Sequence, residues 1–183
     1  MKMLEGIRII DLTTVIFGPY ATQMLADLGA EVIKIESPTG DTPRYMGGFK
    51  KTPYMGGTHM TVNRGKKSVV LDLKKPEDAE VLRKLISSAD VFVHNVRAKA
   101  IGRLGFGYSD VKAMKPDIIY AHFAGFSQDG PWADWPAYDD VIQAATGTTS
   151  LLSKVDGNPK PRYLPSLIAD KVSGTYGAQA LLA

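Results

Sequence analysis

Short runs rich in β-branched and other apolar residues alternate along the chain with stretches in which apolar residues recur every three or four positions. The runs predict buried strands, because strands covered on both faces are almost continuously apolar. The stretches between them predict amphipathic helices. The predicted strands are residues 7–12, 31–36, 68–73, 91–94 and 118–121, and the predicted helices are residues 20–28, 76–86, 109–114, 138–146 and 172–182.

This alternation of strands and helices is typical of an α/β fold. We therefore predict a Rossmann-like, open and mostly parallel sheet with helices on both faces. Residues 7–36 form its first βαβ unit, with a right-handed crossover. Ligands of such sheets bind beyond the carboxyl ends of the strands. The loops after Leu12, Glu36, His94 and Ala121 are therefore expected to carry the chemistry.

Two longer segments are predicted to be loops. Residues 37–65 are polar and rich in Gly, Pro and Thr, and a loop of this length is usually functional or mobile. Residues 125–136 contain both tryptophans, Trp132 and Trp135, for which packing within the loop is favoured over lining a pocket. Ser109 is predicted to cap the helix that begins beside it.

The stretch LPSLIADKVSG at residues 164–174 is an apolar run that ends in a carboxylate and leads into a small-residue helix. Asp170 is therefore predicted where that helix begins, where a side chain can cap free N–H groups and the helix dipole favours the ionised carboxylate. An ionised, positioned carboxylate is also a nucleophile for covalent catalysis on an acyl group. These residues alone leave both interpretations open.

Composition narrows the kinds of protein that this chain can be. The 183 residues are 44% hydrophobic and 22% charged, which is typical of one globular domain. There is no cysteine, which excludes disulfides and thiolate chemistry. A net charge of +3 is too mild for a nucleic-acid interface, and no apolar run is long enough to span a membrane. We expect a cytoplasmic protein that binds neither nucleic acid nor membrane.

Two common kinds of cofactor site are also excluded. The first strand–helix turn, TTVIFGP at residues 13–19, has one glycine and not the G-x-G-x-x-G pattern that dinucleotides need. His59, His94 and His122 are far apart and lack metal-ligand spacing, so no metal site is predicted.

Several segments, in this order and spacing, resemble the family III CoA transferases, the group of formyl-CoA, carnitine and bile-acid CoA-transferases. The resemblance covers essentially the whole chain. It is carried by DLT at 11–13, GPYA at 18–21, LADLGAEVIKIE at 25–36, NRGKKS at 63–68, LDLK at 71–74, ADVFVHN at 89–95, RLG at 103–105, GFSQDGP at 125–131 and YD at 138–139.

The resemblance implies a larger protein than these residues. Members of the family have a Rossmann-type domain and a smaller domain, and two chains are threaded through each other as interlocked rings. Residues 1–183 would then be the N-terminal part of the large domain, without the second domain and the C-terminal return. The sequence also stops within a helical pattern, at residues 179–183, which points the same way. We expect an interlocked homodimer for the full-length protein.

The resemblance also implies a chemistry. Asp170 falls on the family's nucleophile, which attacks the thioester of an acyl-CoA and becomes an aspartyl-CoA thioester before a carboxylic acid takes over the CoA. Acyl-CoA and a carboxylic acid would be the substrates, and no cofactor would be bound permanently. Covalent catalysis of this kind divides one hard exchange into easier steps.

The same resemblance implies a CoA site, with some departures from the family's pattern. His94 and Val96 stand where the family commonly has an acid and an aromatic residue, so adenine stacking is not supported by this sequence. Guanidinium groups suit phosphate binding. The residues expected to contact CoA are Leu71, Lys74, Asn95, Val96, Arg97, Arg103 and Tyr138.

The acyl pocket is expected to be more apolar than in formyl-CoA transferases. Those enzymes have a glutamine before the Gly-Pro turn, where this chain has Ile16 and Phe17. The difference argues against oxalate as acceptor and favours larger, more apolar acids.

Two alternatives stay open. The α-methylacyl-CoA racemases resemble this sequence as well, but their catalytic histidine is replaced by Tyr138, before Asp139. A tyrosine is a poor base for an α-proton at neutral pH, so transferase is favoured. The second alternative is a non-catalytic CoA-binding subunit, which only the short length supports.

Overall fold

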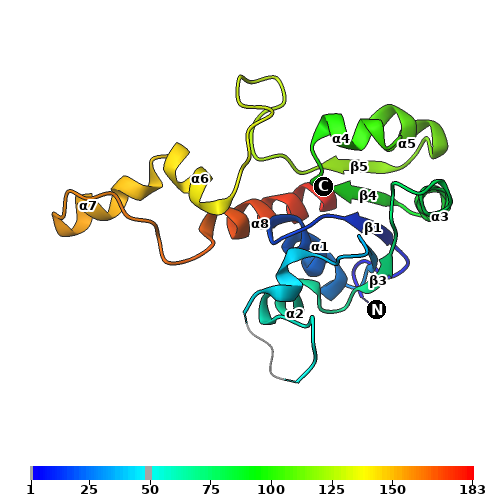
Figure 1. Ribbon diagram of the computed structural model, residues 1–183, viewed down its shortest axis with the longest axis horizontal. Helices are drawn as coiled ribbons and strands as arrows, with labels where there is room; N and C mark the ends of the chain where they lie inside the picture. Colours follow the sequence, from blue (N-terminus) through cyan, green and yellow to red (C-terminus); the bar gives the residue numbers. More distant parts are fainter. Residues whose placement is uncertain (1, 48–50) are drawn as a thin grey trace. The chain divides into compact units, whose positions relative to one another are not determined.

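The computed structural model describes residues 2–47 and 51–183 (Figure 1). The chain forms two compact units. The first consists of Met1–Phe123 and Gly174–Ala183 and is called the sheet unit, and the second consists of Ala124–Ser173 and is called the small unit.

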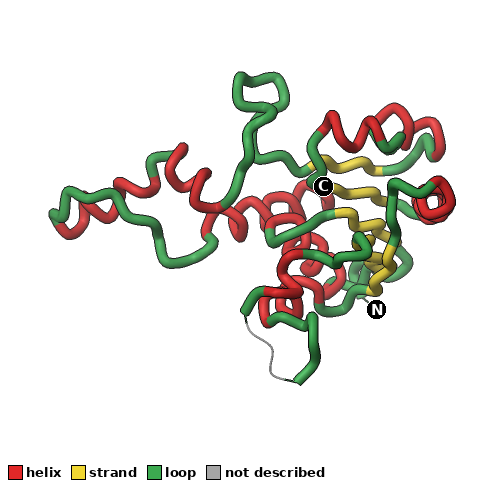
Figure 2. The backbone as a smooth tube through the Cα atoms, in the orientation of Figure 1, coloured by secondary structure: helices red, strands yellow, loops and turns green. Residues whose placement is uncertain are grey.

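The sheet unit is built on five parallel strands in the order β3-β2-β1-β4-β5. Figure 2 shows the strands of this sheet in yellow. The register places Leu12 of β1 opposite His94 of β4, and His94 opposite His122 of β5. The predicted α/β fold with a parallel sheet is therefore confirmed. The strands are β1 (Arg8–Leu12), β2 (Glu31–Glu36), β3 (Lys67–Val70), β4 (Val91–His94) and β5 (Ile119–His122).

Helices cover both faces of this sheet, and each face has its own hydrophobic core. One core packs α3 (Pro76–Ser87) and α5 (Tyr108–Met114) on the sheet through Leu82, Ile86, Phe92, Phe106 and Val111. The other packs α1 (Phe17–Asp27) and the C-terminal half of α8 (Ile168–Leu182) through Ile9, Leu25, Val32, Val93 and Ala178. Apolar side chains on alternate sides of the strands therefore hold the layers together.

Several predicted elements need correction. The segment predicted as a loop at residues 37–65 contains the 3-10 helix η1 (Thr42–Tyr45) and the helix α2 (Gly57–Asn63), while residues 48–50 lie outside the described part of the chain. A further helix, α4 (Ala98–Arg103), was not predicted. These helices bury one or two side chains each, so they leave no periodic pattern in the sequence.

Helix starts also differ from the prediction. Helix α1 begins at Phe17, because proline is tolerated in the first turn of a helix and Pro19 lies there. Helix α5 begins after Gly107, whose N–H donates to the Asp110 carboxylate at 3.0 Å, so Ser109 is inside the helix and is not its cap. Strand β3 ends at Val70, three residues earlier than predicted.

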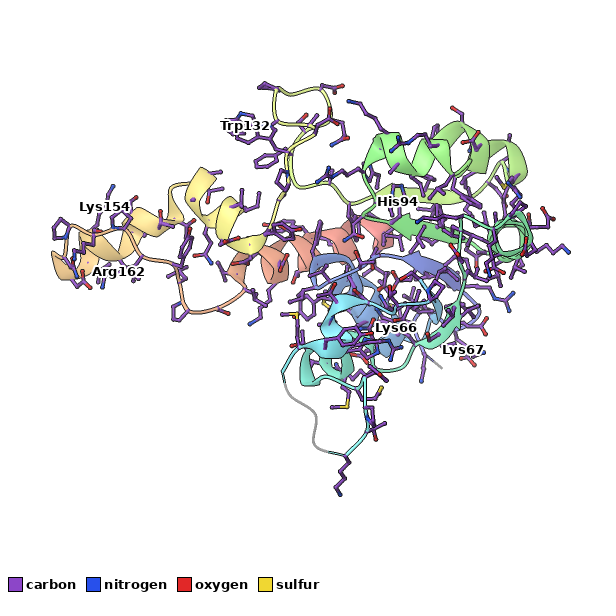
Figure 3. The ribbon with its side chains drawn as sticks, viewed as in Figure 1. Lys66, Lys67, His94, Trp132, Lys154 and Arg162 are labelled. Atoms are coloured by element: carbon purple, nitrogen blue, oxygen red, sulfur yellow. The ribbon has the colours of Figure 1, made fainter. Side chains whose placement is uncertain are left out.

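A buried ion network ties the segment after β2 to the carboxyl end of the sheet. The carboxylate of Asp11 at the end of β1 accepts hydrogen bonds from the Thr13 N–H at 2.9 Å and from the hydroxyls of Thr13 and Thr22 at 2.5 and 2.6 Å. The Lys66 ammonium lies 3.0 Å from the same carboxylate and also donates to the backbone oxygen of Pro19 at 2.8 Å (Figure 3). The Lys34 ammonium pairs with Asp41 at 2.9 Å.

Electrostatics show how strongly this network is coupled. Burial alone would raise the pKa of Asp11, but Lys66 and Lys34 and the two threonine hydroxyls lower it to about 2. Burial lowers the pKa of Lys66 to about 8, although Asp11 opposes that shift. Each of the two charges therefore needs the other to remain ionised inside the protein.

The small unit contains α6 (Asp139–Ala145), η2 (Thr148–Ser150), α7 (Leu151–Asp156) and the first residues of α8. The Arg162 guanidinium donates to both carboxylate oxygens of Asp156 at 2.7 Å (Figure 3). Within residues 124–173, all of which are described, the buried residues are polar, Asp139 and Gln143, and no hydrophobic side chain is buried. The stability of this unit therefore depends on polar contacts more than on an apolar core of its own.

Lys66→Met is expected to lower the free energy of unfolding by about 3–5 kcal/mol, because it leaves the Asp11 carboxylate buried without its cation. Urea denaturation measures the loss. Lys67→Met is the matched control: its side chain is 70% exposed and pairs with Glu31 at the surface, so about 1 kcal/mol or less is expected. Equal losses in both variants would contradict the role given to the buried pair.

Candidate functional site

The carboxyl ends of β1 and β4 are joined by the side chain of Asn95. Its Oδ1 accepts the N–H of Thr14 at 2.9 Å, and its Nδ2 donates to the backbone oxygen of Thr14 at 2.9 Å. Both ends of the amide are therefore used to fix the loop after β1 against the loop after β4. This contact defines the shape of the sheet edge at which ligands of parallel sheets bind.

Beside this link lies a stacked pair of imidazoles. The rings of His94 and His122 are 4.5 Å apart between centroids and nearly parallel. The Nε2 of His94 lies 2.6 Å from the Tyr120 hydroxyl. Burial, and then the neighbouring His122, lower the pKa of His94 to about 3, so this ring is neutral at physiological pH. His94 therefore carries no charge at the position where the family commonly has an acid. His122 is the last residue of β5, one residue beyond the predicted end of that strand, and is half-buried.

Apart from Asn95, the residues expected to contact CoA in the sheet unit fall into two groups. Leu71 is buried in the hydrophobic core and Val96 packs against that core, so their side chains stabilise the fold. Lys74, Arg97 and Arg103 are exposed cations, and Arg97 and Arg103 stand at the two ends of α4. This second group is available to an anionic ligand.

The two residues before the Gly-Pro turn, which were expected to line the acyl pocket, pack against other parts of the sheet unit. Ile16 is buried. Phe17 stacks on Phe123 with ring centroids 4.9 Å apart. The start of α1 therefore carries an aromatic pair, and neither Ile16 nor Phe17 supplies a polar side chain there.

In the small unit, Asp170 is the third residue of α8. The N–H of Asp170 donates to Oδ1 of Asp139 at 3.0 Å. The other oxygen of Asp139, Oδ2, accepts from the side-chain amide of Gln143 at 2.6 Å. The helix does begin near Asp170 as predicted, but Asp170 lies inside its first turn and is not the residue that precedes it.

The ionisation of Asp170 differs from the expectation that the helix dipole would keep its pKa low. Burial, and then the like charge of Asp139, raise the pKa of Asp170 to about 6. The carboxylate is mostly ionised at neutral pH yet more basic than an ordinary aspartate, and nucleophilicity rises with basicity. This arrangement suits attack on an activated acyl group or removal of a proton.

Tyr138, the residue before α6, has an exposed phenol, and its neighbour Asp139 is nearly buried. Sequence reasoning missed the roles of Asp139 and Gln143. The available signal was their spacing: residues four apart on a helix face each other, and an amide and a carboxylate at that spacing form a hydrogen bond.

The described residues were compared with the requirements of a metal site and of a membrane-spanning helix. Residues 2–47 and 51–183 contain no group of three or more metal-ligating side chains that could hold a metal ion. Across the same residues, no helix has both the length and the apolar character needed to cross a membrane.

Asp170→Asn is expected to stabilise the protein at neutral pH. Because the folded pKa of about 6 lies above the ordinary value of 3.8, the charged form opposes folding, and stability falls as pH rises between these values. The carboxyl is partly exposed, so solvent screening limits the gain to about 1 kcal/mol near pH 7.5, and the gain disappears near pH 4.

Urea denaturation of wild type and Asp170→Asn at the two pH values measures this gain. The control is Asp140→Asn, because Asp140 is an exposed aspartate on α6. Its stability relative to wild type should be the same at both pH values. A loss of stability in Asp170→Asn near neutral pH would contradict the repulsion between the two carboxylates.

Comparison with known proteins identifies the family. Residues 4–183 match CoA-transferase family III. The chain is 37% identical to succinate–glutarate CoA-transferase of Agrobacterium fabrum, over 98% of this chain and 46% of that protein. It is 42% identical to acetyl-CoA:oxalate CoA-transferase of Acetobacter aceti, over 94% of this chain and 44% of that one.

A solved structure agrees with this relationship. The crystal structure of a CAIB/BAIF family protein from Brucella suis superposes with a TM-score of 0.90 at 33% identity, covering 97% of this chain and 47% of that one. The chain thus spans about half the length of the relatives that it matches. With a match over residues 4–183 and a shared fold, the chain belongs to CoA-transferase family III.

Proposed function

We propose that the protein moves CoA from an acyl-CoA to a carboxylic acid, with Asp170 as the nucleophile. Membership of the family supports the reaction class. The observation that carries the role of Asp170 is the state of its carboxyl group, whose pKa is raised to about 6 by burial and by the neighbouring Asp139. The N–H of Asp170 donates to that same Asp139 carboxylate.

The proposed reaction proceeds through anhydrides and thioesters. A carboxylate oxygen of Asp170 attacks the thioester carbonyl, the C–S bond breaks, and CoA leaves as a thiolate. The thiolate then attacks the Asp170 carbonyl carbon of the mixed anhydride, which releases the donor acid as a carboxylate and leaves an aspartyl-CoA thioester. The acceptor carboxylate repeats these two steps in reverse, so CoA is transferred without net proton uptake.

The neighbouring carboxylate gives this mechanism a physical advantage. Asp170 loses its negative charge when it is acylated, so the repulsion between Asp170 and Asp139 disappears in the intermediate. An interaction that is unfavourable in the free enzyme and absent after attack lowers the barrier to that attack.

The CoA contacts are part of the same proposal. Lys74, Arg97 and Arg103 are exposed cations of the sheet unit, and cations of this kind bind phosphate groups. Tyr138 is proposed to contact the pantetheine end, because its phenol is exposed beside Asp139.

The acceptor is proposed to be a carboxylic acid with more apolar surface than oxalate. Ile16 and Phe17 provide no polar side chain at the start of α1, and Phe17 is already stacked on Phe123. Relatives are named for glutarate and for oxalate, so a screen should include short dicarboxylic acids as well as longer apolar acids.

Asp170→Ala is expected to abolish transfer in the full chain while leaving the fold intact, because it removes the carboxylate that attacks the thioester. Wild type mixed with an acyl-CoA and quenched with hydroxylamine should carry a hydroxamate on Asp170, detected by mass analysis of the peptide spanning residues 164–183. Asp140→Ala is the matched control and should keep both transfer and the hydroxamate. Transfer by Asp170→Ala would disprove the proposed nucleophile.

A racemase is the second candidate, because a carboxylate with a pKa of about 6 also suits a general base. Exchange of the α-proton of an acyl-CoA in heavy water tests it. Exchange without any hydroxamate on Asp170 would favour the racemase, and CoA binding without either reaction would favour a non-catalytic CoA-binding subunit.

A homodimer is the proposed assembly, as in the interlocked dimers of the family. The small unit supports this proposal because it buries no hydrophobic side chain among residues 124–173 while it exposes large ones. Such surfaces usually bind another protein surface. The exposed side chains are Trp132, Trp135, Tyr138, Leu151, Val155, Tyr163, Leu167 and Val172.

The double variant Leu151→Lys/Val155→Lys is expected to lose the dimer, because it places two charges on the exposed apolar face of α7, where Val155 is 83% exposed. Light scattering after size-exclusion chromatography measures the mass of the full chain. Val81→Lys, on the exposed side of α3, is the control and should remain dimeric. A double variant that stays dimeric would show that α7 is not in the interface.

A further inference from the structure

Gln143 is one of two buried polar residues of the small unit, with 3% of its surface exposed. Its side-chain amide makes three hydrogen bonds. The Oε1 atom accepts the N–H of Leu164 at 2.9 Å, and the Nε2 atom donates to Oδ2 of Asp139 at 2.6 Å and to the backbone oxygen of Ser166 at 3.3 Å. One side chain thus connects α6 to the segment that leads into α8.

These contacts allow only one orientation of the amide. The NH₂ group must face the carboxylate of Asp139, and the carbonyl must face the N–H of Leu164, because the opposite orientation would place two acceptors or two donors against each other. A carboxylate in the same place could not donate to Asp139 unless it held a proton. The position therefore requires a neutral donor and an acceptor together.

The contacts of Gln143 lead directly to the proposed nucleophile. Asp139 uses one carboxylate oxygen for Gln143 and the other for the N–H of Asp170. The segment that Gln143 fastens, from Leu164 to Ser166, is the stretch that immediately precedes α8. Two sets of hydrogen bonds thus fix the position of Asp170: one runs through Asp139, and the other holds the segment before α8.

We infer that Gln143 is a positioning residue that aims Asp139 at the backbone of Asp170 and fixes the segment before α8, so that the Asp170 carboxyl is held ready to attack. This inference rests on the proposed function for its catalytic meaning. Its physical content, the control of the environment of Asp170, is independent of that function.

The charged groups around this cluster are few. Asp139 on α6 is the charged residue that acts on the Asp170 carboxyl. The ammonium of Lys171, the next residue on α8, donates to the Ser166 hydroxyl at 2.9 Å. Asp140 on α6 is exposed and bonds to the N–H of Val141, and the phenol of Tyr138 before α6 is exposed. A change at Gln143 should therefore reach Asp170 mainly through Asp139.

The test follows the titration of Asp170 itself, by NMR of the full chain with isotope-labelled aspartate, so it needs no enzymatic turnover. The wild-type midpoint is expected at about 6. Gln143→Glu adds a like charge next to Asp139 and should raise that midpoint by about half a unit or more. Gln143→Met removes the donor that holds the Asp139 carboxylate in place, so that carboxylate can turn away from Asp170 and the midpoint should fall by a similar amount. Asp139→Asn removes the like charge itself and should lower the midpoint too.

Gln23 provides a matched control. It is a buried glutamine that donates to Asp27, four residues along α1, in the sheet unit. Gln23→Met also removes a buried amide, but its partner Asp27 is exposed and keeps its ion pair with Arg64. This variant should leave the titration of Asp170 unchanged. Movement in opposite directions in the two Gln143 variants, with none in Gln23→Met, supports the positioning role.

An unchanged midpoint in both folded Gln143 variants would overturn the inference and reduce Gln143 to a structural residue. Activity then separates the two proposals. If the midpoint shifts but no hydroxamate forms on Asp170 in wild type, the proposed function fails while the positioning of Asp170 stands. If the hydroxamate forms but neither midpoint shifts, the positioning inference fails while the proposed function stands.

Discussion

The buried ion pair between Asp11 and Lys66 is the constraint on which the sheet unit depends. It joins the end of β1 to the residue before β3, and the chain between them, including η1 and α2, is closed as a loop by this contact. The pair is shielded from water, so removing one partner would leave an uncompensated charge. Two segments by which the sequence resembles its family, residues 11–13 and 63–68, therefore meet in this buried ion pair.

In the small unit, the buried polar side chains shape the surroundings of Asp170. Asp139 and Gln143 occupy its interior, and the nearby Asp170 has a pKa raised by its burial and by the second carboxylate beside it. Such an arrangement opposes folding, and proteins retain it where chemistry benefits. The same unit lacks a buried apolar side chain within residues 124–173, which is consistent with the proposal that a second copy of the chain covers it.

The sequence predicted the parallel sheet well because β1, β2 and β4 are short segments in which β-branched and other apolar residues are concentrated and buried. It missed α2 and α4, since helices with one or two buried residues have no clear periodicity. It selected Asp170 but not its raised pKa, which depends on burial and on Asp139, a residue 31 positions away in sequence. Contacts of that range are set by tertiary packing, and a single sequence does not display them.

The central claim is that CoA passes through a covalent bond to Asp170. Turnover by the full chain with an acceptor acid whose carboxylate oxygens are isotopically heavy tests it most directly. The proposed steps leave one acceptor oxygen on the Asp170 carboxyl in each cycle, so the peptide spanning residues 164–183 should become heavier, and fragmentation should place the label on Asp170. Formation of the acceptor's CoA thioester with an unlabelled Asp170 would contradict the account.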